Sequence, residues 1–115
     1  MEGDPYYALE KLSAAAHLLG LKRGSYQSRL EKAFMSFHPA QPRDFPPELG
    51  QEYESICNEL TCIEAQGDEG ALRATLARMT DQKARELTNR IIELHEQLNA
   101  HLRRSEAQPR RNPGR

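Results

Sequence analysis

Apolar residues recur every three or four positions along most of the chain, which is the spacing of amphipathic helices. No stretch alternates apolar and polar residues, and β-branched residues do not cluster, so we expect no strand. The pattern predicts five helices, whose apolar positions are Leu9, Leu12, Ala15, Ala16 and Leu19; Tyr26, Leu30, Ala33, Phe34 and Phe37; Leu49, Tyr53, Ile56, Leu60 and Ile63; Leu72, Leu76 and Met79; and Ala84, Leu87, Ile91, Leu94, Leu98 and Leu102. The fold class expected is therefore an all-α bundle of four to five helices.

Residues with known preferences for helix ends mark the boundaries. Asp4, Ser25 and Thr80 each precede a predicted helix and supply a side-chain oxygen for its first turn. Gly20 is expected to end the first helix in a left-handed conformation. Pro39 stops the second helix, because a residue before proline is disfavoured in helical geometry.

Four of the seven prolines lie between the second and third helices, at Pro39, Pro42, Pro46 and Pro47. The first two close one helix, and the last two open the next, where a missing N–H group costs nothing. Phe45 lies just before the third helix and is expected to act as an apolar plug. We interpret this segment as a rigid elbow between two helices.

The elbow is also the place where a binding groove is expected, if the protein has one. Aromatic and cationic side chains gather there and could surround a cleft between the second and third helices. The alternative is that the aromatic residues are simply part of the core. The candidate groove residues are Phe37, His38, Arg43, Phe45 and Tyr53.

The chain of 115 residues is long enough for one domain and one modest core. Its net charge of −1 is unevenly distributed, because residues 1–102 carry eleven Lys/Arg against sixteen Asp/Glu, whereas residues 103–115 carry five arginines against one glutamate. We therefore expect a helical domain over residues 1–102 and a disordered basic tail over residues 103–115.

The sequence contains no apolar run near the roughly 20 residues that cross a bilayer, and its N-terminus does not resemble a secretion signal. We expect no membrane association and a cytoplasmic location. Cys57 and Cys62 are five residues apart in a predicted helix, on different faces, so both are expected to be reduced.

Residues capable of catalysis or metal binding do not fall into a recognisable pattern. His95 and His101 are six residues apart, whereas helical metal chelation needs a spacing of four. Glu48, Glu52 and Glu59 share roughly one face of the third helix, which we interpret as a solvated face. No catalytic residue, metal site or cofactor is expected, and the sequence favours a protein that is not an enzyme.

Residues 14–34, AAAHLLGLKRGSYQSRLEKAF, have the helix, glycine turn and helix of a DNA-reading hairpin. The segment resembles the helix-turn-helix at the C-terminus of bacterial enhancer-binding activators and their nucleoid-protein relatives. The matching features are Ala15-Ala16, Leu19-Gly20-Leu21, Arg23, Ser25-Tyr26 and Arg29-Leu30. The resemblance implies that the residues contacting DNA are Lys22, Arg23, Ser25, Gln27, Ser28, Arg29 and Lys32.

A second resemblance covers roughly residues 6–100. The succession RLEKAF, DFPPEL, Ile56 to Thr61, EGALRATLARMT and ARELTNRIIELHEQL is similar to a family of short bacterial all-helical proteins of uncharacterised function. This resemblance implies a fold and no function.

The leading expectation is a non-catalytic helical protein that binds another macromolecule, most simply a protein. The apolar row of the last helix either faces the bundle or pairs with a second copy in a homodimer. The alternative function is a small transcriptional regulator that binds DNA through residues 14–34. The net negative charge of residues 1–102 counts against this alternative, because it repels a polyanion such as DNA.

Overall fold

A computed structural model of the chain describes residues 3–64 and 70–107. These residues form five α-helices and one short 3₁₀ helix, with no strand among them, so the predicted all-α bundle is confirmed. In chain order the elements are α1 (Pro5–Gly20), α2 (Tyr26–Phe37), η1 (Pro42–Asp44), α3 (Pro47–Leu60), α4 (Ala71–Ala77) and α5 (Asp81–Ala107).

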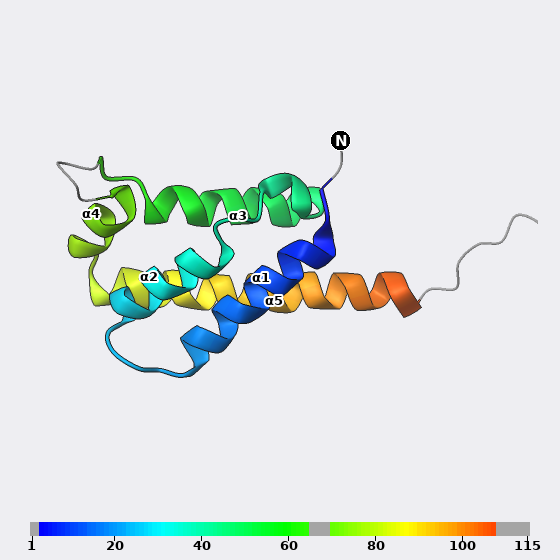
Figure 1. Ribbon diagram of the computed structural model, residues 1–115, viewed down its shortest axis with the longest axis horizontal. Coiled ribbons are helices and arrows are strands. Elements are labelled where there is room, and N and C mark those ends of the chain that lie inside the picture. Colours follow the sequence, from blue (N-terminus) through cyan, green and yellow to red (C-terminus); the bar gives the residue numbers. More distant parts are fainter. Residues whose placement is uncertain (1–2, 65–69, 108–115) are drawn as a thin grey trace, which may run out of the picture.

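The long helix α5 is the element around which the others are arranged. Figure 1 shows α3 running alongside α5 in the opposite direction, with the α1–α2 hairpin lying across α5. The short helix α4 lies at one end of the bundle and contacts α2 and α3. None of the helices in the described ranges combines the length and the hydropathy that crossing a bilayer requires.

The core is formed mainly by the apolar stripes that the sequence predicts. Ala8, Ala40 and Ala74 are buried in addition, whereas Ala16 and Ile63 of the predicted stripes are only partly buried. The stripe of α5 is buried along its whole length against α1, α2 and α3. Its buried residues are Ala84, Leu87, Ile91, Leu94, Leu98 and Leu102. This row therefore faces the bundle of its own chain, and a homodimer, which stays a prediction, would have to use another surface.

Three of the predicted helix caps are present. The side-chain oxygens of Asp4, Ser25 and Thr80 accept hydrogen bonds from backbone N–H groups of the following turn at 3.0, 3.0 and 3.1 Å. The second helix ends at Phe37, directly before His38 and Pro39, as expected. Local sequence chemistry is thus sufficient to fix these boundaries.

The prediction for Gly20 is right about where the first helix ends and wrong about the left-handed conformation. Gly20 is the last residue of α1, and the left-handed backbone falls instead at Lys22, with φ of 55°, and at Gly24, with φ of 79°. The N–H of Leu21 still bonds to the carbonyl of His17, so the hydrogen-bonded turns continue past the glycine. The chain reverses in the following link, where Gly24 accepts the positive φ without strain.

Two helices are shorter than predicted. Helix α3 ends at Leu60 and leaves Ile63 outside it, where the N–H of Ile63 donates to Thr75 Oγ1 at 2.9 Å. Helix α4 ends at Ala77, so Met79 lies in the link to α5 and packs partly against the core. The expected stop at residues 66–68 lies outside the described residues.

The last helix is longer than predicted. It continues through residues 103–107, which were expected to belong to the basic tail. Leu102 is buried, and the hydroxyl of Tyr6 donates to Glu106 Oε2 at 2.8 Å, so α1 supports the final turns of α5. The remainder of the predicted tail, residues 108–115, lies outside the described residues.

Candidate functional site

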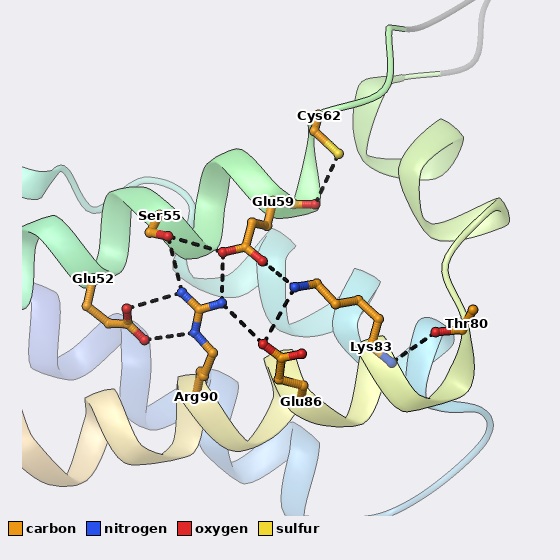
Figure 2. Close-up of polar contacts among 8 residues, drawn as sticks. All are labelled: Glu52, Ser55, Glu59, Cys62, Thr80, Lys83, Glu86 and Arg90. Atoms are coloured by element: carbon orange, nitrogen blue, oxygen red, sulfur yellow. Dashed lines mark hydrogen bonds and ion pairs between the residues drawn. The ribbon is translucent and has the colours of Figure 1, made fainter.

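A polar network connects α3 to α5 on one side of the bundle (Figure 2). Arg90 binds Glu52 through two parallel contacts, Nε to Oε2 at 2.9 Å and Nη2 to Oε1 at 3.1 Å. Its Nη1 also donates to Glu59 Oε2 at 2.8 Å. Lys83 donates through Nζ to the other oxygen of Glu59.

The sequence spacing explains why these four residues meet. Glu52 and Glu59 are seven residues apart on α3, and Lys83 and Arg90 are seven apart on α5, which is about two helical turns in each case. Because the two helices run antiparallel, the pairs align in opposite order. The face that we interpreted as solvated is therefore half-buried at this point.

The network sets the charge states of its members. The hydrogen bonds from Lys83 and Arg90 lower the pKa of the Glu59 carboxyl to about 2. The same contact with Glu59 raises the pKa of Lys83, and the contact with Glu52 raises that of Arg90. All three groups therefore stay charged near neutral pH and hold one another in place.

Beside the network lies a cleft of about 310 Å³ between the end of α3, helix α4 and the start of α5. Ile63 and Met79 give it an apolar lining, and charged groups lie at its edge. The full set of lining residues is Glu59, Cys62, Ile63, Thr75, Arg78, Met79, Thr80 and Lys83.

The segments that line the cleft are fixed by contacts from other elements. The side-chain amide of Gln27 donates to the carbonyl of Met79 at 2.9 Å and to Asp81 Oδ1 at 3.0 Å, which connects α2 to the link between α4 and α5. The bond between Ile63 and Thr75 closes the opposite wall. The cleft is thus preformed rather than dependent on an unsupported loop.

The groove expected at the proline elbow is not formed by the residues named for it. Phe37, Phe45 and Tyr53 are buried and pack on one another, with ring centroids of Tyr53 at 5.7 Å from Phe37 and 4.5 Å from Phe45. The Tyr53 hydroxyl donates to the carbonyls of Phe37 and Ala40, at 3.0 and 2.7 Å. These three aromatic residues belong to the core, which is the alternative that the sequence left open.

His38 and Arg43 are exposed, and His38 stacks on Phe34. A shallow hollow of about 490 Å³ does lie at the elbow, but it includes only Arg43 and Phe45 of the five residues named. Its lining residues are Pro42, Arg43, Phe45, Pro47, Gly50, Gln51 and Glu54.

Sequence reasoning missed Asp44, which organises the elbow. Its buried carboxylate accepts from the N–H of Asp4 at 2.9 Å and from that of Gln41 at 2.8 Å. The contact with Gln41 is a local turn interaction typical of aspartate. Pro42, which lies between the two residues and favours a turn, could have indicated it from the sequence. The contact with Asp4 spans 40 residues and has no local signal.

The positions expected to contact DNA fall into two groups. Lys22 and Arg23 are exposed in the link between α1 and α2, and Lys32 is exposed in the middle of α2. The other positions have contacts within the protein: Ser25 caps α2 through the N–H of Ser28, Gln27 binds the link before α5, and Arg29 lies over the Tyr26 ring at 4.4 Å.

The histidines and cysteines remain separate in the part of the chain that the structure describes, where no three residues of metal-binding type gather. His95 Nε2 lies 2.9 Å from Ser13 Oγ, and partial burial lowers the pKa of His95. Cys57 and Cys62 are both free thiols, as expected. Burial raises the pKa of Cys57 to about 11, whereas Cys62 is exposed at the cleft.

No family model matches this chain, and no curated protein or solved structure is significantly similar to it. The two resemblances noted in the sequence therefore stay predictions.

Proposed function

We propose that the protein acts without catalysis, as a module that binds another protein. The observation that carries this proposal is the preformed cleft between α3, α4 and α5, with its apolar interior and charged edge. Protein interfaces commonly combine a desolvated apolar centre with a polar rim, and the cleft has this composition.

The polar groups beside the cleft support binding rather than proton transfer. Glu59 is ionised and engaged by both Lys83 and Arg90, so it is a poor general acid or base near neutral pH. Their mutual contacts hold α3 against α5, and this arrangement suits a rigid docking surface.

The proposal places the protein in the cytoplasm. Its two cysteines are free, and a reducing compartment would keep the exposed thiol of Cys62 in that state.

The test is a comparison of partners captured by the intact protein and by two matched variants. Ile63→Glu places a charge in the cleft at a side chain that is not packed into the core. Met35→Glu makes the same change on α2, where Met35 is 59% exposed and outside the cleft. We expect a protein captured by the wild type and by Met35→Glu to be lost with Ile63→Glu, while circular dichroism shows all three folded. Equal recovery by both variants would refute the cleft as the binding site.

Binding of DNA by residues 14–34 is a second candidate function, and one observation favours it. Glu31 is the one acidic residue between Leu21 and His38, and it pairs with Arg73 of α4 at 2.9 Å. The exposed cations of this hairpin are Lys22, Arg23 and Lys32. Within the described ranges, none of the three has a carboxylate within 4.0 Å. Cations left free in this way are able to contact phosphates.

A salt titration with a mixed-sequence DNA duplex tests this alternative. The logarithm of the binding constant should fall steeply with that of the salt concentration, and Arg23→Ala should reduce the slope by about 1. Arg43→Ala, at the elbow, is the control and should leave the slope unchanged. If no complex forms even at low salt, the hypothesis that the protein binds DNA is refuted.

A further inference from the structure

We infer that the partner docks by inserting a large aliphatic side chain into the α3–α4–α5 cleft and placing a carboxylate on the exposed Arg78 at its edge. This inference rests on the proposed function and names the chemistry of the partner, which is an acidic protein segment with leucine-like side chains. Three properties of the described residues support it: the charge of the cleft, the charge of the surrounding surface, and the apolar lining.

The charge of the cleft comes from Arg78, a cation whose charge is not matched by a carboxylate in the described part of the chain. Among the described residues, the cleft lining contains two cations, Arg78 and Lys83, and the carboxylate of Glu59. Lys83 and Arg90 both pair with this carboxylate, and they are shared with Glu86 and, for Arg90, with Glu52, so Lys83 is not free to bind a partner. Arg78 donates through Nη1 to the carbonyl of Ala74 at 3.3 Å and has no carboxylate within 4.0 Å in the described part of the chain. Its remaining N–H groups are therefore free to bind a carboxylate of the partner.

The surface formed by α2, α4 and the links beside them also carries a positive net charge. Residues 21–38 and 70–85 each contain four Lys/Arg and one acidic residue, and these segments meet where α2 packs on α4. Helix α3, in contrast, contains four glutamates and neither lysine nor arginine. Three of these glutamates precede the end of α3 that lines the cleft. Such a separation of charge steers acidic partners toward the α2–α4 end of the molecule.

The apolar lining favours a protein over a nucleic acid. Ile63 and Met79 offer aliphatic and thioether surface, and the lining residues that the structure describes include no aromatic ring on which a base could stack. The volume of about 310 Å³ is near the lower limit of ligand pockets and suits one or two side chains. Methionine is also well suited to pack against aliphatic side chains of varied shape.

The probe for this inference is a fluorescein-labelled dodecapeptide of alternating Glu-Glu and Leu-Leu pairs, measured by fluorescence anisotropy with the full-length protein at low salt. One control peptide replaces every glutamate with lysine, and a second replaces every leucine with serine. We expect the acidic, leucine-containing peptide to bind at least about tenfold more tightly than either control, since both its charge and its apolar side chains are used.

Two protein variants locate the contact. Arg78→Glu reverses the free cation at the cleft and should weaken binding of the acidic peptide by about tenfold or more. Arg103→Glu makes the same charge change on the last turns of α5, far along the helix, and should change the affinity by less than about twofold. The lysine peptide should respond to Arg78→Glu in the opposite direction.

Several results would overturn the inference. Failure of the acidic peptide to bind at low salt would refute the acidic, leucine-containing partner. If Ile63→Glu nevertheless loses a protein that the wild type captures, the proposed function still holds and only the inferred chemistry of the partner is wrong. Equal weakening by Arg78→Glu and Arg103→Glu would show that only net charge matters. Tighter binding of a short DNA duplex than of the acidic peptide, weakened by Arg78→Glu, would assign this surface to nucleic acid.

Discussion

Helix α3 is held at its two ends by different physical interactions. Near its start, Tyr53 packs between Phe37 and Phe45, and Gly50 lies directly against the elbow, in a buried contact. On its face toward α5, from Glu52 to Glu59 near its end, α3 is bound by charged side chains that are partly open to solvent (Figure 2). The first contact depends on shape and the second on charge.

The difference indicates which end can respond to conditions. A buried aromatic contact is largely independent of pH and salt, whereas a half-exposed ion network weakens with both acid and high ionic strength. The cleft lies beside the ionic end, and Glu59 and Lys83 belong to its wall. Conditions that loosen the network should therefore alter the cleft before they alter the elbow.

The largest expected effect is at the aromatic end. Tyr53→Ala should lower the free energy of unfolding by about 3–5 kcal/mol, because it removes a buried ring that packs on two others. Urea denaturation monitored by circular dichroism measures the change. Tyr53→Phe keeps the ring and removes only the donor to the carbonyls of Phe37 and Ala40, so it should cost about 1–2 kcal/mol. Equal losses for the two variants would contradict the assignment of most of the stability to ring packing.

A smaller effect is expected where α3 touches the elbow. A Cβ atom at Gly50 would lie 2.7 Å from the carbonyl oxygen of Pro42, so Gly50→Ala forces backbone to move and should destabilise the protein by about 1–3 kcal/mol. Gly20→Ala is the matched control, because a Cβ there meets no atom within 4 Å. It should stabilise the protein by about 0.5 kcal/mol through a less flexible unfolded chain. The close approach would be disproved if both variants shifted the urea midpoint in the same direction.

The features that the sequence predicted correctly are those with a local cause. The apolar stripes and the caps at Asp4, Ser25 and Thr80 depend on residues within one or two turns, and they appear as expected. The error at Gly20 arose because a glycine at a helix end is only a preference, and the following link had its own glycine.

The features that the sequence could not supply depend on the relative placement of helices. Glu52 and Glu59 were visible as one face of a helix, but their partner Arg90 is more than 30 residues away, and only the antiparallel packing of α3 on α5 brings them together. The cleft is similar, because three elements line it. The sequence showed that aromatic residues gather at the elbow, but it did not show whether they face a groove or the core. In the structure they face the core, where the Tyr53 hydroxyl donates to buried backbone carbonyls.

The smallest expected effect tests the ionic end and has a defined pH dependence. The pKa of Glu59 is lowered to about 2 in the folded protein, so its ionised form contributes stability that is fully present above the unfolded pKa of about 4.5 and is lost as the pH falls toward 2. Glu59→Gln should therefore lower the free energy of unfolding by about 1–2 kcal/mol near neutral pH, a modest value because the network is partly exposed. Urea denaturation of wild type and variant across this pH range measures the difference.

Glu54→Gln is the control for that measurement, because Glu54 is exposed on the same helix and has no cation within 4.0 Å in the described residues. The stability gap between wild type and Glu59→Gln should narrow as the pH falls below about 4 and should also narrow in high salt, while Glu54→Gln stays close to wild type throughout. A gap that is constant with pH would mean that Glu59 acts through packing and not through its charge. In that case the two ends of α3 would be held by the same kind of contact, and the cleft would not respond to acid before the elbow does.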